Sequence, residues 1–404
     1  MTKSLLYRLS YIIAMCCTMV STLCSCEIFT KPDLKEPQPI WTASLSTGEL
    51  IGSLMPIIVS DYGIISVGSR NKQPVLRMFN KQSGKMIWEW DNVLGGKNLL
   101  IKRLHSYRNF LTLHDATSSS GLDIEKGITL WSGYHSYSTD IWSTGFGQLY
   151  FFRKGENIIV KGDMSNGREE EINIGALSAG FIAPTLYIDA ATRDTMLVTA
   201  GSQHTRDSTS IEFYFRTYLV LYNLSKHKLI YQLLQREGYG NDKTGNLAPT
   251  NVCVLYDNKV YTAIGKSIQC NNIVDGSLVW RREFSSNFFF SRIVEADGKI
   301  IGNGDDEGVM YALDAKTGAI IWETKTSSAS GDILAQNGVV YMIGLGDGKL
   351  HAIDIATGKH IWKLTSPDYE SSNTNSFFED AVSGDGQYIY VRSFLNLYCY
   401  KAAK

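Results

Sequence analysis

The amino-acid sequence predicts an all-β fold, an eight-bladed β-propeller of four-stranded antiparallel blades in which the N-terminal strand closes the last blade. Three observations support this prediction. A phrase returns along the chain about every forty residues, each copy divides into short apolar segments separated by glycine-rich turns, and the strand that the last copy lacks stands near the N-terminus. Repeats of roughly 40–50 residues with a strand pattern are typical of propeller blades.

The repeated phrase consists of an apolar strand, an Asp or Asn, a polar turn with Gly, and a second strand with Trp. Its clearest copies are "LDAKTGAIIWETKT" at 313–326 and "IDIATGKHIWKLTS" at 353–366. Two copies have drifted, because Glu171 stands at the Trp position of the third and Tyr231 at that of the fourth. The turn position of each copy is occupied in order by Gly84, Gly127, Gly167, His227, Gly276, Gly318 and Gly358. Successive turn positions are separated by 43, 40, 60, 49, 42 and 40 residues.

Each copy is interpreted as four strands, as the seventh illustrates with segments 332–338, 339–346, 349–355 and 360–366. The hairpins between them contain Gly, which adopts positive φ angles at little cost. No helix is needed to explain the pattern. The end of the chain supplies inner strands without an outer one, and "PIWTASL" at 39–45 matches the missing strand. A ring of eight blades closed by that strand would leave no exposed sheet edge at its ends.

The Trp of each phrase is expected to lay a large apolar ring between adjacent blades, while the turn Gly adopts a conformation costly to other residues. These residues are predicted to hold the fold and to do no chemistry. In the same register Cys270 and Cys399 stand where Ala312 and Ala352 stand, so both are predicted to be small core residues. The predicted blade-docking residues are Trp41, Trp88, Trp131, Trp280, Trp322 and Trp362.

Composition excludes some classes of function. The 404 residues include 39 Lys and Arg against 40 Asp and Glu, so no basic surface for nucleic acid is predicted. Hydrophobic residues make up 44% of the chain, enough to bury a large core. Beyond the N-terminal segment no stretch reaches about 18 consecutive apolar residues, so no membrane-spanning segment is predicted there.

Residues 1–25 are predicted to be a lipoprotein signal peptide, because a basic start precedes a short apolar run. The "LCSC" that ends at Cys26 resembles the bacterial lipobox, in which the final Cys is lipidated. Residues 26–38 would then form the lipidated Cys and tether, and 39–404 the propeller. The alternative is an ordinary signal peptide with an incidental Cys. Several acyl chains would anchor a soluble body at a membrane, so an outer-membrane lipoprotein of the cell envelope is predicted. "EIFT" after Cys26 lacks the acidic cluster that resembles a surface-export tag in some bacterial lineages, which favours a body that faces the periplasm.

Five long connections are predicted to lie on one face of the propeller: 132–140, 203–216, 236–249, 283–292 and 366–378. Long loops on a rigid scaffold often carry binding residues. Their mixture of aromatic residues, Ser, Asn and Gly suits protein or carbohydrate partners. The alternative for each aromatic residue is that it packs its own loop onto the propeller. The candidate binding residues are Tyr134, Tyr137, Tyr214, Tyr239, Phe288, Phe289 and Tyr369.

The sequence shows no catalytic or metal-ligating constellation. Its His residues lack metal-ligand spacing, and no Cys-x-x-Cys-His motif is present. "GDDEG" at 304–308 and "GKS" at 265–267 resemble calcium and phosphate loops only in part, and both are predicted to be hairpin turns. The prediction is therefore no catalytic residue, no metal and no cofactor.

The repeat resembles the pyrroloquinoline-quinone-type propeller repeats over nearly all of the predicted mature chain. One branch of that family contains quinone-dependent dehydrogenases, and another contains cofactor-free lipoproteins of outer-membrane protein assembly. The dehydrogenases usually carry an adjacent Cys pair over the cofactor, a calcium site and a catalytic Asp. The only adjacent pair in this sequence, Cys16 and Cys17, lies in the predicted signal peptide. The resemblance specifies the fold more than the function.

Three functions stay open. The leading hypothesis is a non-catalytic, lipid-anchored scaffold that binds a protein partner at the bacterial envelope, with outer-membrane protein assembly as the process that the resemblance suggests. The alternative is a surface lipoprotein that binds a glycan or another small ligand through its long loops. A quinone-dependent dehydrogenase is the least supported, because no cofactor site is visible in the sequence.

Overall fold

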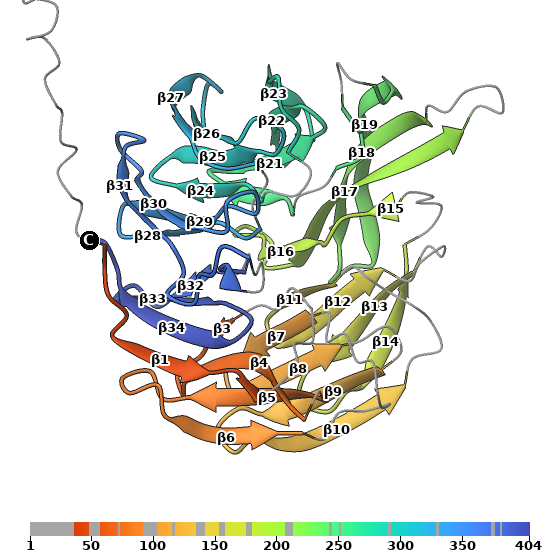
Figure 1. The fold of residues 1–404 in the computed structure, drawn as a ribbon. Coiled ribbons are helices and arrows are strands. Elements are labelled where there is room, and N and C mark those ends of the chain that lie inside the picture. Colours follow the sequence, from red (N-terminus) through yellow and green to blue (C-terminus); the bar gives the residue numbers. More distant parts are fainter. Residues whose placement is uncertain are drawn as a thin grey trace, which may run out of the picture. The chain divides into compact units, whose positions relative to one another are not determined.

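The computed structural model describes residues 36–47, 57–71, 73–91, 103–114, 118–134, 142–152, 158–174, 180–206, 213–241, 245–249, 252–288, 292–328, 331–372, 376–379 and 382–404. The elements in these ranges are all β-strands, and they form eight sheets arranged as the blades of a propeller (Figure 1). The predicted fold class is therefore confirmed. The predicted signal peptide and Cys26 lie outside the described residues and stay predictions. Within those residues, no helix has the length and apolar character needed to cross a membrane.

Blades 1 to 4 follow one another along the chain, and each begins with its innermost strand and ends with its outermost. Blade 1 contains β3 (Ile58–Val59), β4 (Ile64–Arg70), β5 (Gln73–Phe79) and β6 (Met86–Trp90), with β2 (Ser46–Thr47) parallel to β4. Blade 2 contains β7 (Arg103–Tyr107), β8 (Phe110–His114), β9 (Ser118–Asp123) and β10 (Ile128–Tyr134). Blade 3 contains β11 (Trp142–Gly145), β12 (Gln148–Phe152), β13 (Ile158–Asp163) and β14 (Glu169–Asn173). Blade 4 contains β15 (Gly180–Phe181) and β16 (Thr185–Ile188), which both pair with β17 (Thr195–Arg206), then β18 (Phe213–Asn223) and β19 (Lys228–Tyr239).

Blades 5 to 7 repeat this order. Blade 5 contains β20 (Val254–Tyr256), β21 (Lys259–Ile264), β22 (Ser267–Asn272) and β23 (Leu278–Glu283). Blade 6 contains β24 (Val294–Ala296), β25 (Lys299–Gly304), β26 (Val309–Asp314) and β27 (Ile320–Lys325). Blade 7 contains β28 (Leu334–Gln336), β29 (Val339–Ile343), β30 (Leu350–Asp354) and β31 (His360–Leu364). The second strand of blade 7, VVYMI, is buried throughout, because neighbouring blades cover both of its faces.

Blade 8 combines the two ends of the propeller. It contains β32 (Val382–Gly384), β33 (Tyr388–Arg392), β34 (Asn396–Lys401) and, as its outermost strand, β1 (Trp41–Ser44). Strand β1 runs antiparallel to β34, with Trp41 opposite Cys399 and Ser44 opposite Asn396, and Figure 1 shows the two strands side by side. The predicted closure of the ring by the N-terminal strand is confirmed.

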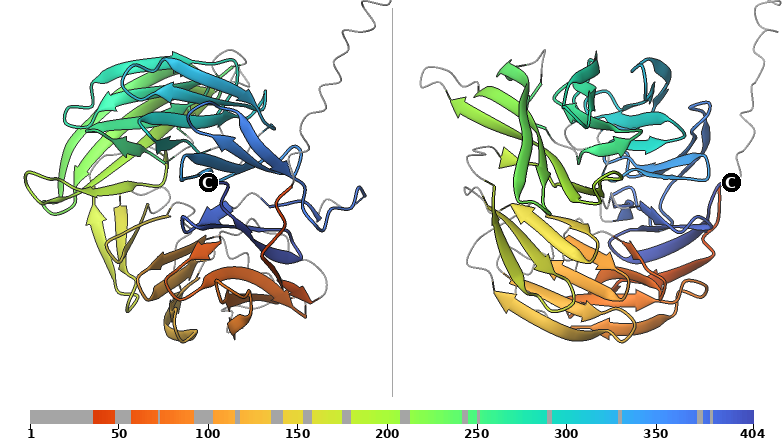
Figure 2. Two further views of the ribbon diagram at one scale, coloured as in Figure 1. Left: turned by 90° about the vertical axis from the view of Figure 1, so that its left-hand side faces the viewer. Right: turned by 180° about the vertical axis from the view of Figure 1, so that it is seen from behind.

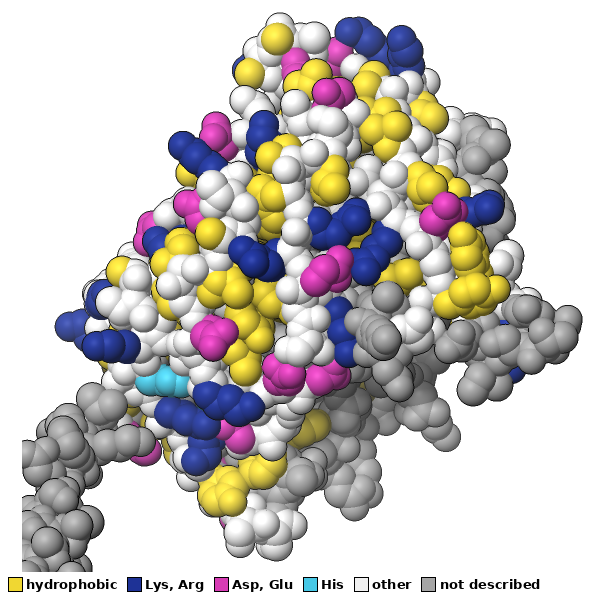
Figure 3. Space-filling view, turned by 90° about the horizontal axis from the view of Figure 1, so that it is seen from above, with side chains coloured by type: hydrophobic (Ala, Val, Ile, Leu, Met, Phe, Trp, Pro, Cys, Tyr) yellow, Lys and Arg dark blue, Asp and Glu magenta, His cyan; other side chains and the backbone are white. Residues whose placement is uncertain are grey.

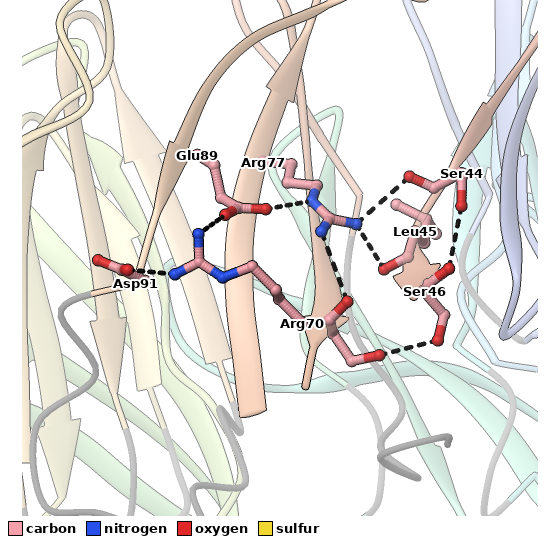
Figure 4. Close-up of polar contacts among 8 residues, drawn as sticks. Ser44, Leu45, Ser46, Arg70, Arg77, Glu89 and Asp91 are labelled. Atoms are coloured by element: carbon pink, nitrogen blue, oxygen red, sulfur yellow. Dashed lines mark hydrogen bonds and ion pairs between the residues drawn. The ribbon is translucent and has the colours of Figure 1, made fainter. Parts of the chain in front are cut away.

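A buried arginine fixes the point where the chain passes from blade 8 to blade 1 (Figure 4). Arg77 of β5 donates from Nη1 to the carbonyl oxygen of Leu45 at 2.8 Å and from Nε to Glu89 at 2.7 Å. Glu89 also pairs with Arg70 at 2.6 Å. Arg77 exposes only 7% of its side chain, whereas Arg70 exposes 45%. Arg77, the more buried of the two arginines, thus links the ion pairs of blade 1 to the segment between β1 and β2, which we call the closing segment.

Five of the six Trp residues predicted to dock the blades lie against the turn Gly of the next blade, Trp362 being the exception. The indole of Trp322 in blade 6 donates to the carbonyl oxygen of Ile355 in blade 7 at 2.8 Å. A Cβ atom on Gly358, whose φ is +72°, would lie 2.7 Å from the Trp322 ring. The same pairing joins Trp41 with Gly84, Trp88 with Gly127, Trp131 with Gly167, and Trp280 with Gly318. This geometry agrees with the hypothesis that the Trp residues dock adjacent blades. The contribution of each contact to the stability of the fold stays a prediction.

The contact between blades 3 and 4 lacks both members of this pair. Glu171 of blade 3 stands where other blades have Trp, and His227 of blade 4, with a φ of +50°, stands where they have Gly. At the next contact Tyr231 replaces Trp, and its hydroxyl donates to the carbonyl oxygen of Ile273 at 2.9 Å. The contact that lacks an aromatic ring at the Trp position also lacks the turn Gly, whereas Gly276 is retained against the ring of Tyr231. This pattern agrees with a turn Gly that makes room for the ring of the preceding blade.

In blades 5 to 8, small residues of the third strand lie opposite the Trp positions. Cys270 pairs with Trp280 and Cys399 with Trp41, as Ala312 and Ala352 pair with Trp322 and Trp362. The predicted role of the two Cys as small core residues is confirmed, because both are buried and free. Burial raises the pKa of the Cys270 thiol to about 11 and that of Cys399 to about 12, so both stay neutral near pH 7.

The outer edges of the blades carry exposed aliphatic residues. In blade 6 a β-bulge inserts Ile321 between Ile320, which pairs with Leu313, and Trp322. The bulge lets the Trp ring turn toward the next blade while Ile320 and Ile321 stay 42% and 45% exposed. Figure 3 looks at the molecule from above the view of Figure 1 and shows hydrophobic side chains interspersed with Lys and Arg on this side.

Candidate interaction surface

The connections between blades and the hairpin turns between second and third strands meet on one face, which we call the loop face. The amide of Phe288, in the connection from blade 5 to blade 6, donates to the carbonyl oxygen of Gly265 in a hairpin turn at 3.1 Å. The amide of Phe378, in the connection from blade 7 to blade 8, donates in the same way to Gly348 at 3.2 Å. The long connections predicted to share a face are thus held to its hairpin turns.

Blade 4 extends beyond its neighbours on the loop face. Strands β17, β18 and β19 have 12, 11 and 12 residues, against 6 for each of the corresponding strands of blade 5. Figures 1 and 2 show these three strands in green, longer than the strands of neighbouring blades. The additional part, which we call the blade-4 extension, comprises residues 203–206, 213–217 and 236–239. It lies within two of the long connections that the sequence singles out.

A second β-bulge marks the start of the extension. The pairing of β18 with β19 shifts register between Leu221 and Tyr222, as in other blades near the Trp position, and again between Thr217 and Tyr218. An additional bulge increases the local twist and redirects the strand. Beyond it, the hydroxyl of Thr217 donates to the carbonyl oxygen of Leu247 and ties the extension to the connection toward blade 5.

One face of the extension, which we call the tyrosine face, presents two Tyr and an ion pair. Tyr214 and Tyr239 face each other across β18 and β19, with their rings in a T-shaped arrangement and their centroids 5.1 Å apart. Arg216 lies over the ring of Tyr214 at 5.9 Å and pairs with Glu237 at 3.4 Å. Tyr239 is 44% exposed. The result is a solvent-facing aromatic surface with one cation and one anion beside it.

The other face of the extension contains a second aromatic group. His204 of β17 contacts Phe213 of β18 with a centroid separation of 5.6 Å, and Arg206 lies over Phe213 at 5.9 Å. Phe215 is buried against Gly240, where an added Cβ atom would lie 2.8 Å from its ring. This face therefore anchors the extension through Phe215 while His204 and Arg206 stay at the surface.

The structure brings together two of the predicted binding residues, Tyr214 and Tyr239. Tyr369 lies elsewhere on the loop face, in the connection from blade 7 to blade 8, where it is 47% exposed and stacks on Phe377 at 5.5 Å. Three further candidates give no information on binding, because Tyr137, Phe289 and the side chain of Tyr134 lie outside the described residues.

The prediction that Phe288 belongs to a binding surface is wrong. Its side chain is fully buried and packs edge-on against Phe284 at 4.9 Å, within the apolar cluster that includes Tyr311. The loop crosses the end of the contact between blades 5 and 6, and Phe288 fills the apolar space beneath it. Phe288 thus anchors its loop, which is the alternative that the sequence left open for each aromatic residue.

The innermost strands surround an axial cavity of about 460 Å³. Its walls are mainly aliphatic, and the inner strands of five blades contribute Val59, Val254, Val294, Leu334 and Val382, with Ser383 and Gly384 of β32 beside Val382. Arg292 and Asp332 also line the cavity and pair with each other at 2.8 Å. This lining does not fit an anionic quinone with a calcium ion, because it offers a single guanidinium and a single carboxylate among mainly aliphatic residues. Among the described residues, no three His, Cys, Asp or Glu side chains are grouped to hold a metal ion.

Sequence reasoning identified the segments of the extension and both Tyr residues, but it missed their charged neighbours. Arg216 and Glu237 lie on different strands, and their proximity depends on the register of β18 with β19. Alternation along each strand would have placed Arg216 on the face of Tyr214 and Glu237 on the face of Tyr239. The sequence therefore contained the face of each charged residue on its own strand, but not the register that brings the two residues together.

The fold and repeat define an eight-bladed propeller with pyrroloquinoline-quinone-type repeats, and the predicted resemblance is confirmed. Residues 249–404 match the family model described as outer membrane protein assembly factor BamB. No curated protein sequence matches the chain. The family match covers blades 5 to 8, which also carry the clearest copies of the repeat.

Solved structures share the propeller at low sequence identity. BamB from Moraxella catarrhalis is 12% identical, with a TM-score of 0.59 over 91% of this chain and 100% of that chain. The quinohemoprotein alcohol dehydrogenase from Comamonas testosteroni is 12% identical, with a TM-score of 0.61 over 91% and 77%. The computationally designed protein Ika8 is 13% identical, with a TM-score of 0.64 over 89% and 99%. Similarity at this identity shows the fold alone, since one fold serves many functions.

Proposed function

We propose that this protein is a non-catalytic, lipid-anchored scaffold at the bacterial outer membrane that binds a protein partner on its loop face. The observation that carries the proposal is the blade-4 extension, which presents Tyr214, Arg216 and Tyr239 on a rigid three-stranded support. The match of residues 249–404 to the BamB family model supports a partner in outer-membrane protein assembly. The body faces the periplasm in this proposal.

The physical chemistry of the tyrosine face favours a protein partner. Tyr and Arg are enriched in the cores of protein interfaces, and Tyr loses little side-chain entropy on binding. The ring contact between Tyr214 and Tyr239 and the ion pair of Arg216 with Glu237 restrain these side chains before a partner arrives. Preorganisation of this kind lowers the entropic cost of association.

Glycan binding is the second candidate, and the same residues favour it. The exposed ring of Tyr239 could pack against a sugar ring, while Glu237 and Arg216 supply an acceptor and donors for hydroxyl groups. The two candidates differ in what they require of the remaining loop face. A protein partner would contact more of it, whereas a glycan would be confined to the extension.

Cys26→Ser is expected to release the protein from membranes into the soluble fraction. The reason is that several acyl chains at one site hold a soluble body at a bilayer, and the variant lacks the sulfur that would carry the first of them. Fractionation of cells and metabolic labelling with a radioactive fatty acid measure both effects. A variant that is still labelled and still sediments with membranes would contradict the anchor.

Cross-linking in native membranes, read out by mass spectrometry, tests the docking surface. Proteins of outer-membrane assembly are expected to cross-link to the wild type and to lose about tenfold or more in yield with Tyr214→Ala/Tyr239→Ala, since interface hot spots cost ~2 kcal/mol each. Tyr62→Ala is the matched control, because Tyr62 is 39% exposed in the turn between β3 and β4, away from the loop face. Unchanged yield in the double variant would reject the tyrosine face, and no cross-linked protein in any sample would leave glycan binding as the function to pursue.

A further inference from the structure

The axial cavity is built from equivalent positions of successive blades. Val254, Val294 and Leu334 are the first residues of β20, β24 and β28, and they pair with Tyr261, Ile301 and Tyr341 of the adjacent strands. All three are half-buried and line the cavity. A wall of partly accessible aliphatic side chains around a cavity that opens to solvent favours an apolar occupant.

The charged residues of the cavity wall lie at one level, two residues before the inner strands β24 and β28 begin. The equivalent positions there are Val252 in blade 5, Arg292 in blade 6 and Asp332 in blade 7, and all three line the cavity. Arg292 and Asp332 lie where the connections of the loop face enter the inner strands. The charged pair therefore marks the loop-face end of a cavity whose other lining residues are aliphatic apart from Ser383 and Gly384.

Arg292 has hydrogen-bonding capacity to spare. Its Nε contacts Asp332 Oδ1 at 2.8 Å, and this is its only polar side-chain contact with the described residues. A guanidinium has five N–H donors in a planar fork, so the two terminal amino groups can still hold a second carboxylate in a bidentate arrangement. The side chains of Arg292 and Asp332 are 49% and 45% exposed, so a ligand can reach them from solvent.

We propose that the axial cavity binds an aliphatic carboxylate, with the chain between the inner strands and the head group on Arg292. The volume of about 460 Å³ falls within the usual range of small-ligand sites. A sugar would leave its hydroxyl groups facing Val254, Val294 and Leu334 without hydrogen-bond partners, which is costly in an apolar site. This inference stands apart from the docking of a partner on the blade-4 extension, which involves other residues.

Calorimetric titration of the full chain with decanoate and with decanol tests the proposal. The wild type is expected to bind decanoate, and to bind it about tenfold more tightly than decanol, because only the carboxylate can use the Arg292 guanidinium. Arg292→Met is expected to weaken decanoate about tenfold and to leave decanol unchanged. Val294→Phe, which adds volume to the cavity wall, is expected to weaken both ligands.

Ile321→Ser is the control for non-specific adsorption, because Ile321 is an exposed aliphatic residue on the outer edge of blade 6. This variant is expected to bind both ligands like the wild type. Urea unfolding midpoints of all variants check that the propeller stays folded. The proposal is overturned if the wild type does not bind decanoate, if Arg292→Met weakens both ligands equally, or if Ile321→Ser weakens binding as much as Val294→Phe.

Discussion

Replacing Trp322 with Ala is expected to lower the free energy of unfolding by about 3–5 kcal/mol, the range for a buried Trp whose cavity does not close. The side chain is 8% exposed, lies on Gly358 of the next blade and donates from its indole to the carbonyl oxygen of Ile355. Urea unfolding followed by intrinsic fluorescence measures the change. An unchanged midpoint would contradict the docking role.

A double-mutant cycle separates the contact of Trp322 with Gly358 from other effects. Gly358→Ala meets a φ of +72° that Ala disfavours and places a Cβ atom 2.7 Å from the Trp322 ring and 2.9 Å from Thr324 Oγ1. Gly338→Ala is the matched control, since its φ is +71° and the nearest atom to its Cβ lies 4.0 Å away. Gly358→Ala is expected to cost more than the roughly 1 kcal/mol of the control, and most of the excess should be lost in Trp322→Ala, leaving only the contact with Thr324. An excess that persists without the indole would show that the two residues are not coupled.

The sequence made the fold predictable because the repeat encodes it several times. Each copy contains the same strand, turn and Trp, so a drifted copy can be interpreted from the others. The outer strand of blade 8 was predicted because the last copy lacks one and "PIWTASL" at 39–45 matches it. Even the drifted contact between blades 3 and 4 follows from this logic. Glu171 and His227 depart from the repeat at the same blade contact, one at the Trp position and the other at the Gly position.

The candidate surfaces were less predictable, because loops have no period from which to infer direction. Phe288 and Tyr214 are both aromatic residues in long connections, yet Phe288 fills the contact between two blades and Tyr214 lies on the surface of an extended sheet. Composition alone does not distinguish them. The charged pair of the cavity was partly predictable. Arg292 and Asp332 occupy equivalent positions of neighbouring copies, so their proximity could have been inferred from the sequence.

The closing segment of the ring depends on a contact that no local pattern encodes. The carbonyl oxygen of Leu45 accepts hydrogen bonds from the amide of Ser69 at 2.7 Å and from Arg77 at 2.8 Å. Arg77 and Arg70 both bind Glu89, but only Arg77 reaches the segment between β1 and β2 (Figure 4). The two arginines can therefore be compared directly, because both bind Glu89 and only Arg77 also contacts the closing segment.

Arg77→Met is expected to lower the free energy of unfolding by about 3 kcal/mol, because it removes one partner of a buried ion pair together with its bond to Leu45. Arg70→Met is expected to cost less than about 1 kcal/mol, since Arg70 is half exposed and its ion pairs are screened by solvent. Hydrogen exchange adds a local test. Amides of 41–47 should exchange faster in Arg77→Met than in Arg70→Met, while those of β31, at an outer edge that Arg77 does not touch, should be unchanged. Equal destabilisation by the two substitutions, or exchange that rises equally in β31, would show that the closing segment does not depend on Arg77.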